Sequence, residues 1–260
     1  MFYAVWLEGQ LVWNIPLLTG LIGLAVLYAC LVKIYTNIKI HHKQPLLFFL
    51  CLGILYVTLG SPLSALSHLS FSFHMMQMSI LYFIIPPLFL LGIPEPFPKI
   101  MKRINKLFLP PLAALYTFAF LFLMYHLPVV LTFLSKNTFV HNGYLVVLLV
   151  MSFIMWRPIV KDQNKRYALL SGLLLMPACV LFILTAFIGG LNNPFLAQMT
   201  ANLCISPSQL SSLHILPPPF NTGLDQIMAG ILMIVMHKFA LFVTVRIGKK
   251  VRVHEWGRMG

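Results

Sequence analysis

Residues 168–189 read ALLSGLLLMPACVLFILTAFIG and contain no charged side chain. A helix that crosses the hydrocarbon core of a bilayer needs about 20 mainly apolar residues, so this stretch predicts a transmembrane helix. Other apolar runs along the chain are long enough to cross, or nearly cross, a bilayer. Together they predict seven spans, at 15–34, 46–60, 74–93, 108–126, 140–156, 168–189 and 224–245. The expected fold class is therefore all-α, a polytopic integral membrane protein.

The composition of the whole chain supports this class. Charged residues make up 9% of the 260 residues and the mean hydropathy is +0.90, whereas a soluble domain carries about 25% charged residues. Seven spans with short connections fill the chain, so we expect residues 1–260 to form a single seven-helix membrane domain. The long connection at 190–223 has no charge and several prolines, and we expect it to form an extracytoplasmic cap.

The basic residues predict the orientation of the chain in the membrane. They concentrate after the first, third and fifth spans and in the C-terminal tail, whereas the intervening segments together hold one, Lys136. The positive-inside rule then places the N-terminus outside and the C-terminus in the cytoplasm. The formal net charge of +13 is explained by these clusters, so we expect no nucleic-acid binding.

Histidines mark the predicted extracytoplasmic ends of three spans. His74 begins the third span, His126 ends the fourth and His141 begins the fifth, all at nearly the same membrane level. Ionisable residues at membrane depth are costly and usually face a partner or a cavity. The clustering therefore predicts a metal site or a proton relay, although a single interfacial histidine is more often a hydrogen-bonded anchor.

An acid and two thioethers lie near these histidines in the predicted topology. Asp225 opens the seventh span, Met78 lies one helical turn below His74, and Met75 lies beside it. Imidazole and thioether together favour copper, particularly Cu(I), over cations that prefer oxygen ligands. The alternatives are that the methionines pack the core and that Asp225 caps a helix. The predicted metal-binding set is His74, Met78, His126, His141 and Asp225.

No catalytic motif is present, because the chain lacks GxSxG, HExxH, P-loop and dinucleotide-binding patterns. We therefore expect no catalytic residues and no enzymatic activity. Three of the four cysteines lie inside apolar segments, and none has a paired spacing, so a disulfide framework is not expected.

Several motifs together resemble the CtaG family of cytochrome c oxidase assembly factors, over nearly the whole chain. The residues that carry this resemblance are Gly60, Ser61, Pro62, Leu63, His74, Met75, Gln77, Pro86, Pro87, Leu91, Gly92, Pro94, Trp156, Pro158, Asp225, Gln226, Ala229, Gly230 and Met233. The resemblance implies a multi-pass protein of the bacterial plasma membrane that is required to make an active oxidase. It also implies handling of copper for an apo oxidase subunit, or exchange of copper with a chaperone; self-association stays open.

The chain departs from the family pattern at two positions. Many members have a histidine where this chain has Met78, and many have a second histidine where it has Leu145. The site is then either softer and selective for Cu(I), or partly vacant. We expect a shallow, outward-open copper site in a metallochaperone, with Asp225 orienting an imidazole or balancing charge. The alternatives are a copper transporter with His237 as a deeper station, a metal-free scaffold that docks an oxidase subunit, and a haem or quinone enzyme.

Overall fold

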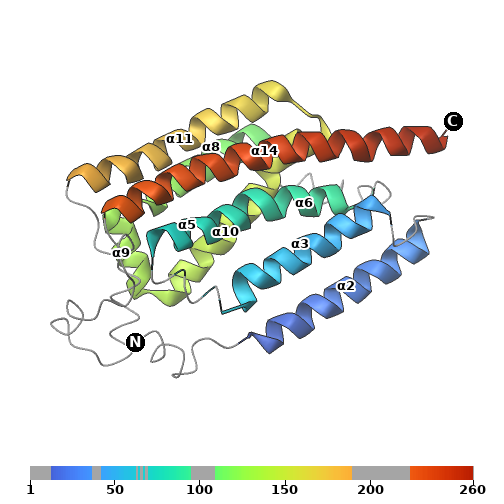
Figure 1. The fold of residues 1–260 in the computed structure, drawn as a ribbon, viewed down its shortest axis with the longest axis horizontal. Coiled ribbons are helices and arrows are strands. Elements are labelled where there is room, and N and C mark those ends of the chain that lie inside the picture. Colours follow the sequence, from blue (N-terminus) through green and yellow to red (C-terminus); the bar gives the residue numbers. More distant parts are fainter. Residues whose placement is uncertain are drawn as a thin grey trace.

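The computed structural model describes residues 13–36, 42–62, 64, 67, 70–94, 109–188 and 223–259, with side chains up to Lys249 in the last range. Within these ranges the chain forms a bundle of roughly aligned helices and no strand (Figure 1). The helices are α2 Ile15–Tyr35, α3 Lys43–Gly60, α5 Phe71–Ser79, the π-helical turn η1 Ile80–Ile84, α6 Ile85–Gly92, α8 Pro111–Tyr125, α9 Pro128–Lys136, α10 Thr138–Lys161, α11 Lys165–Ile188 and α14 Gly223–Met259.

The prediction of an all-helical protein with multiple membrane spans is confirmed. Six helices of the described chain are long and apolar enough to cross a bilayer, and a seventh span results if α8 and α9 are counted as one bent span. Sequence reasoning placed a connection after residue 126, but α9 occupies most of it, because Pro128 begins a new helix at a sharp bend. The predicted cap at 190–223 lies outside the described residues, apart from Gly223.

The third span, Phe71–Gly92, is the most buried of the spans and runs through α5, η1 and α6 without a break. Its π-helical turn ends at Ile84, two residues before Pro86. A proline has no N–H, so Pro86 leaves the carbonyl of Tyr82 without its usual helical donor. The indole Nε1 of Trp156, on α10, donates to that carbonyl at 2.9 Å. A neighbouring helix thus satisfies the freed carbonyl, as the absence of water in the bilayer core requires.

Replacing Trp156 with phenylalanine tests this contact. Trp156 is fully buried, so Trp156→Phe leaves the Tyr82 carbonyl without its donor and should destabilise the fold by about 1–3 kcal/mol. We expect Trp156→Phe to have a lower thermal midpoint in detergent than the wild type. The midpoint is measured by size-exclusion chromatography of heated samples. Trp13→Phe is the control, because Trp13 is 52% exposed; equal midpoints for the two variants would contradict the role of the indole N–H.

Two glycines allow neighbouring helices to approach closely. A Cβ added to Gly92 would lie 2.8 Å from the backbone nitrogen of Phe48 on α3. A Cβ added to Gly230 on α14 would lie 2.5 Å from Ile183 and 3.1 Å from the Cys179 carbonyl, both on α11. Small residues at such crossings are typical of helix packing in membranes. The two contacts fix α6 against α3 and α14 against α11.

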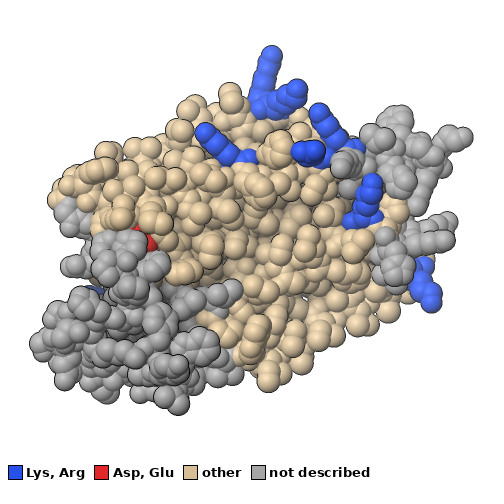
Figure 2. Space-filling model, in the orientation of Figure 1, with Lys and Arg blue, Asp and Glu red and all other residues tan. Residues whose placement is uncertain are grey.

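The charged side chains are distributed unevenly over the bundle. Figure 2 shows lysine and arginine gathered over the part of the molecule toward the C-terminal end of α14. Asp225 lies in the first turn of α14, at the opposite end of that helix. The positive-inside rule predicts that the basic end faces the cytoplasm, and the orientation of the chain stays a prediction.

Candidate metal centre

The three histidines predicted at span ends lie on three different helices. His74 lies in the first turn of α5, where its backbone N–H donates to the Ser70 carbonyl at 3.0 Å. His126 directly follows α8, and His141 lies in the first turn of α10. His74 and His126 are buried, at 4% and 1% exposure. The expectation of a shallow, outward-open site is therefore wrong for these two imidazoles.

Tyr125 joins two of these histidines. Its hydroxyl lies 3.0 Å from Nε2 of His74 and 3.2 Å from Nε2 of His141. Because a phenol has one proton, it donates to one imidazole and accepts an N–H from the other. His74 and His141 thus form a continuous hydrogen-bonded chain through Tyr125. Sequence reasoning missed Tyr125, although a tyrosine beside His126 at a span end was a visible signal.

His126 forms a second pair, with Met75. Its Nδ1 lies 2.6 Å from the Phe122 carbonyl, and its Nε2 lies 3.3 Å from the Met75 sulfur. The carbonyl is an acceptor only, so Nδ1 carries the proton of a neutral ring and Nε2 presents a lone pair. A doubly protonated, charged ring would be costly in this buried position. Two electron-pair donors, one nitrogen and one sulfur, therefore face each other.

Asp225 is placed at the start of α5. Its carboxylate accepts hydrogen bonds from the hydroxyls of Ser70 and Ser72 and from the backbone N–H groups of Phe71 and Ser72, at 2.8 Å and 3.2 Å. A carboxylate at a helix N-terminus satisfies unpaired N–H groups and interacts favourably with the helix dipole. Asp225 thereby binds α14 to α5 and fixes the turn that carries His74.

Gln226 makes the corresponding connection to α11. Its Nε2 donates to the Phe182 carbonyl at 3.0 Å and to the Thr185 hydroxyl at 2.6 Å. Adjacent residues on α14 therefore point to different neighbours, Asp225 to α5 and Gln226 to α11. The pair holds together the end of the bundle that contains the histidines.

The predicted metal-binding set is thus only partly brought together. His74 and His141 meet through Tyr125, and His126 lies against Met75; Met75 and the predicted ligand Met78 are both buried in the apolar core. Within the described residues, no group of three or more His, Cys, Asp or Glu side chains is arranged to hold a metal ion. His68 and His214, the other histidines on the predicted extracytoplasmic side, lie outside the described residues. The ligand set stays a prediction, and the structure places the Met75 sulfur against His126.

Residues 26–247 match the sequence profile of a family described as cytochrome c oxidase caa3 assembly factor (Caa3_CtaG). The chain belongs to this family. The match covers the described spans from the middle of α2 to the last turns of α14 that have described side chains. Neither the curated proteins nor the solved structures contain a match to the chain.

Membership of the Caa3_CtaG family agrees with the resemblance found in the sequence. Several residues that carry the resemblance make contacts between helices. Gln77 on α5 donates to the Thr58 carbonyl on α3 at 2.9 Å, and Trp156, Asp225 and Gln226 make the interhelical hydrogen bonds described above. Many of the residues that carry the resemblance therefore hold the helix bundle together. The His126–Met75 pair lies within this bundle.

Proposed function

We propose that this protein, a multi-pass member of an oxidase assembly family, binds Cu(I) as cargo near His126 and Met75 and passes it to an apo cytochrome c oxidase subunit at the bacterial plasma membrane. The observation that carries the proposal is the 3.3 Å approach of the His126 Nε2 lone pair to the Met75 sulfur. Imidazole and thioether are soft or borderline donors that suit Cu(I). Catalysis is not part of this role.

The surroundings of the pair support a cation of low charge. Met75 and His126 are each 1% exposed, and the ring of Phe182 lies 5.6 Å from the ring of His126. A divalent ion with two neutral ligands would be expensive in such an apolar place, because buried charge costs more as it grows. A soft monovalent cation therefore suits this buried donor pair better than a divalent one.

Tyr125, the neighbour of His126 in the chain, hydrogen-bonds to Nε2 of both His74 and His141. For these imidazoles to bind Cu(I) through Nε2, the hydrogen bonds to Tyr125 must first break. Cu(I) held by only the two ligands His126 and Met75 would exchange ligands readily. Such exchange suits delivery to a partner better than permanent storage.

The test is Cu(I) binding by the detergent-purified protein under anaerobic conditions, measured by competition with a chromogenic Cu(I) chelator. His126→Ala and Met75→Leu should each weaken binding at this site by at least about 100-fold, because even groups that only orient ligands contribute 10–100-fold. Met78→Leu is the matched control: Met78 is a buried methionine on the same helix, 5% exposed, and it should bind as the wild type does.

Three outcomes would overturn the proposal. In the first, His126→Ala and Met75→Leu, shown to be folded by size-exclusion chromatography, retain all the copper bound by the wild type. In the second, Met78→Leu loses copper and Met75→Leu does not, which would restore the ligand predicted from the sequence. In the third, Met75→Leu restores oxidase activity fully in cells that lack the native protein.

A further inference from the structure

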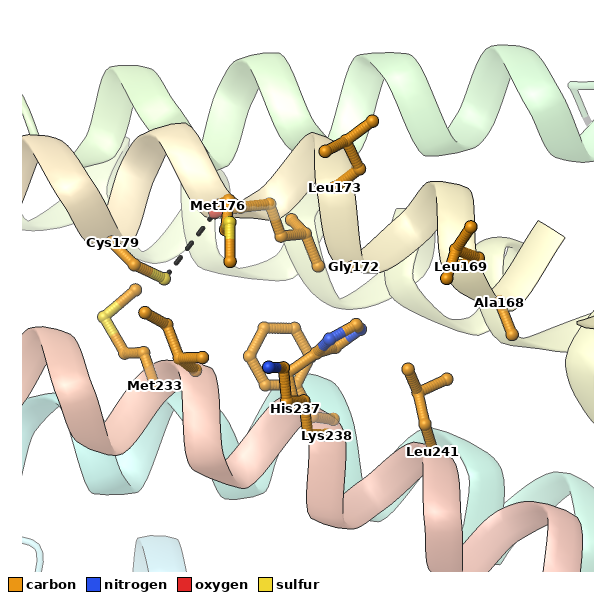
Figure 3. A pocket seen from close by; sticks show the side chains of 13 residues that line it. Ala168, Leu169, Gly172, Leu173, Met176, Cys179, Met233, His237, Lys238 and Leu241 are labelled. Carbon is orange, nitrogen blue, oxygen red and sulfur yellow. Dashed lines mark hydrogen bonds between the residues drawn. The ribbon is translucent and has the colours of Figure 1, made fainter. Parts of the chain in front are cut away.

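A cavity of about 400 Å³, open on one side, lies between α11 and α14, away from the histidine end of the bundle. Its walls are mostly apolar, and it is lined by Phe83 of η1 and by residues of the two helices, among them Leu169, Gly172 and Lys238 (Figure 3). The helices are held close at Gly230, where a Cβ would meet Ile183. At Gly172 the missing side chain leaves space, and a Cβ there would have only the His237 ring within 4 Å.

Soft donor atoms line both walls of this cavity. Met176 and Cys179 are three residues apart on α11, and Met233 and His237 are four apart on α14, so each pair shares one helical face. Figure 3 shows Met176 and Cys179 directed from α11 toward α14, with Met233 directed back toward Cys179. Three sulfur atoms and one imidazole thus line a single cavity, together with the ammonium side chain of Lys238 and without a carboxylate.

His237 provides an independent indication of a ligand. It is 4% exposed, and its Nε2 is buried with no hydrogen-bond partner among the described residues. Its ring packs at 4.9 Å from the ring of Phe83 and 6.0 Å from that of Trp156. A buried polar group without a partner costs free energy, and in a membrane span such a residue usually marks a functional site.

We propose that this cavity is a second Cu(I) site, formed by Cys179, Met233 and His237 with Met176 as a further thioether. The proposal rests on the copper-handling function proposed above and extends it to the membrane interior. On binding, the Cys179 thiol loses its proton to solvent, and the thiolate neutralises the single positive charge of Cu(I). The resulting neutral complex suits a cavity of apolar walls, and its soft ligands exclude magnesium and calcium.

The cavity site and the histidine-end site are distinguished by copper stoichiometry. Anaerobic Cu(I) titration of the full-length protein should give two copper ions for the wild type and one for Cys179→Ala. Met75→Leu should also bind one, and the double variant none. Cys51→Ala is the matched control, because Cys51 is also a buried thiol bonded to a backbone carbonyl, and it should keep both copper ions.

Two further readouts report on the cavity alone. Copper binding in the cavity should release one proton per copper ion and quench the fluorescence of Trp156. Both effects should be lost in Cys179→Ala and retained in Met75→Leu. Met233→Leu, a change of similar volume, should weaken the same site at least tenfold, which keeps the test valid if Cys179→Ala does not fold.

The outcomes separate the two proposals. In one outcome the wild type binds one copper ion, and Cys179→Ala and Met233→Leu keep that ion with unchanged quenching of Trp156 fluorescence. The cavity site is then refuted and the His126–Met75 site stands. If copper is lost in Cys179→Ala but not in His126→Ala or Met75→Leu, the cavity site stands and the site at the histidine end is refuted. A lipid found in the cavity by native mass spectrometry, with no copper bound there, would also refute the cavity site.

Discussion

Gly92→Ala is expected to lower the thermal midpoint of the detergent-purified protein by roughly 6–12 °C. The added methyl carbon would lie 2.8 Å from the nitrogen and 2.9 Å from the Cα of Phe48, and a backbone cannot move aside as a flexible side chain does. The upper end of the usual overpacking cost, about 3 kcal/mol, applies at such a contact, and for a chain of this size each kcal/mol lowers the midpoint by about 2–4 °C.

A hydrogen bond and a ring stack are also formed where Gly92 meets Phe48. The Tyr28 hydroxyl on α2 donates to the Gly92 carbonyl at 2.6 Å, and the ring of Tyr28 stacks on that of Phe48 at 3.8 Å between centroids. Displacing α6 from α3 therefore also loosens α2. Gly92→Ala should bind less copper only to the extent that it unfolds.

Gly53→Ala and Gly143→Ala are the matched controls for this variant. Each glycine lies within a helix and has nothing within 4 Å of an added Cβ, so alanine should leave the midpoint unchanged or raise it, since alanine is the better helix former. A Gly92→Ala midpoint as high as that of these controls would show that α3 and α6 are further apart than described.

Asp225→Ala is expected to destabilise the protein by about 2–6 kcal/mol, because it leaves the backbone N–H groups of Phe71 and Ser72 without their acceptor, at about 1–3 kcal/mol for each unsatisfied N–H. The Ser70 hydroxyl loses its acceptor too, whereas the Ser72 hydroxyl can still donate to the backbone carbonyl of residue 225. Asp225 is 1% exposed, so water cannot readily replace the carboxylate. The expected measurements are a lower yield of monodisperse protein and a lower thermal midpoint.

Two further variants show how Asp225 acts. Asp225→Asn keeps one acceptor oxygen and should fall between Asp225→Ala and the wild type. Ser72→Ala removes one donor to the carboxylate and should lower the midpoint slightly without changing Cu(I) affinity at His126. If Asp225→Asn is as stable as the wild type but loses copper, Asp225 is a metal ligand, as the sequence suggested, and its capping role is secondary.

Part of the candidate site was visible in the sequence. The histidines could be placed at one end of the bundle because each stood at the border of an apolar run, and the basic residues gave every run a direction. The grouping of His74 with His141 follows because both lie at nearly the same predicted membrane level. The sequence could not distinguish Met75 from Met78, because both lie on α5 within one turn, and only the position of α8 decides which sulfur lies against His126.

The role of Asp225 shows the same limit. An acid at a helix start suggests a cap for its own helix, yet this carboxylate caps α5, more than 150 residues earlier in the chain. Sequence periodicity gives no information on how one helix is shifted along another. The apolar faces of these helices are almost uniform, so hydropathy does not define which face meets which neighbour.

The sequence alone was enough to predict that the chain is helical, that it crosses a membrane and that it belongs to this family. In lipid every backbone polar group must be satisfied within the chain, so a long apolar run has to be a helix, and its length and flanking charges are local properties. Only the tertiary structure decided that Tyr125 joins two histidines, that Met75 faces His126 and that Cys179 and His237 line one cavity. These contacts depend on the rotation and crossing of helices, which small residues and buried hydrogen bonds set between distant parts of the chain.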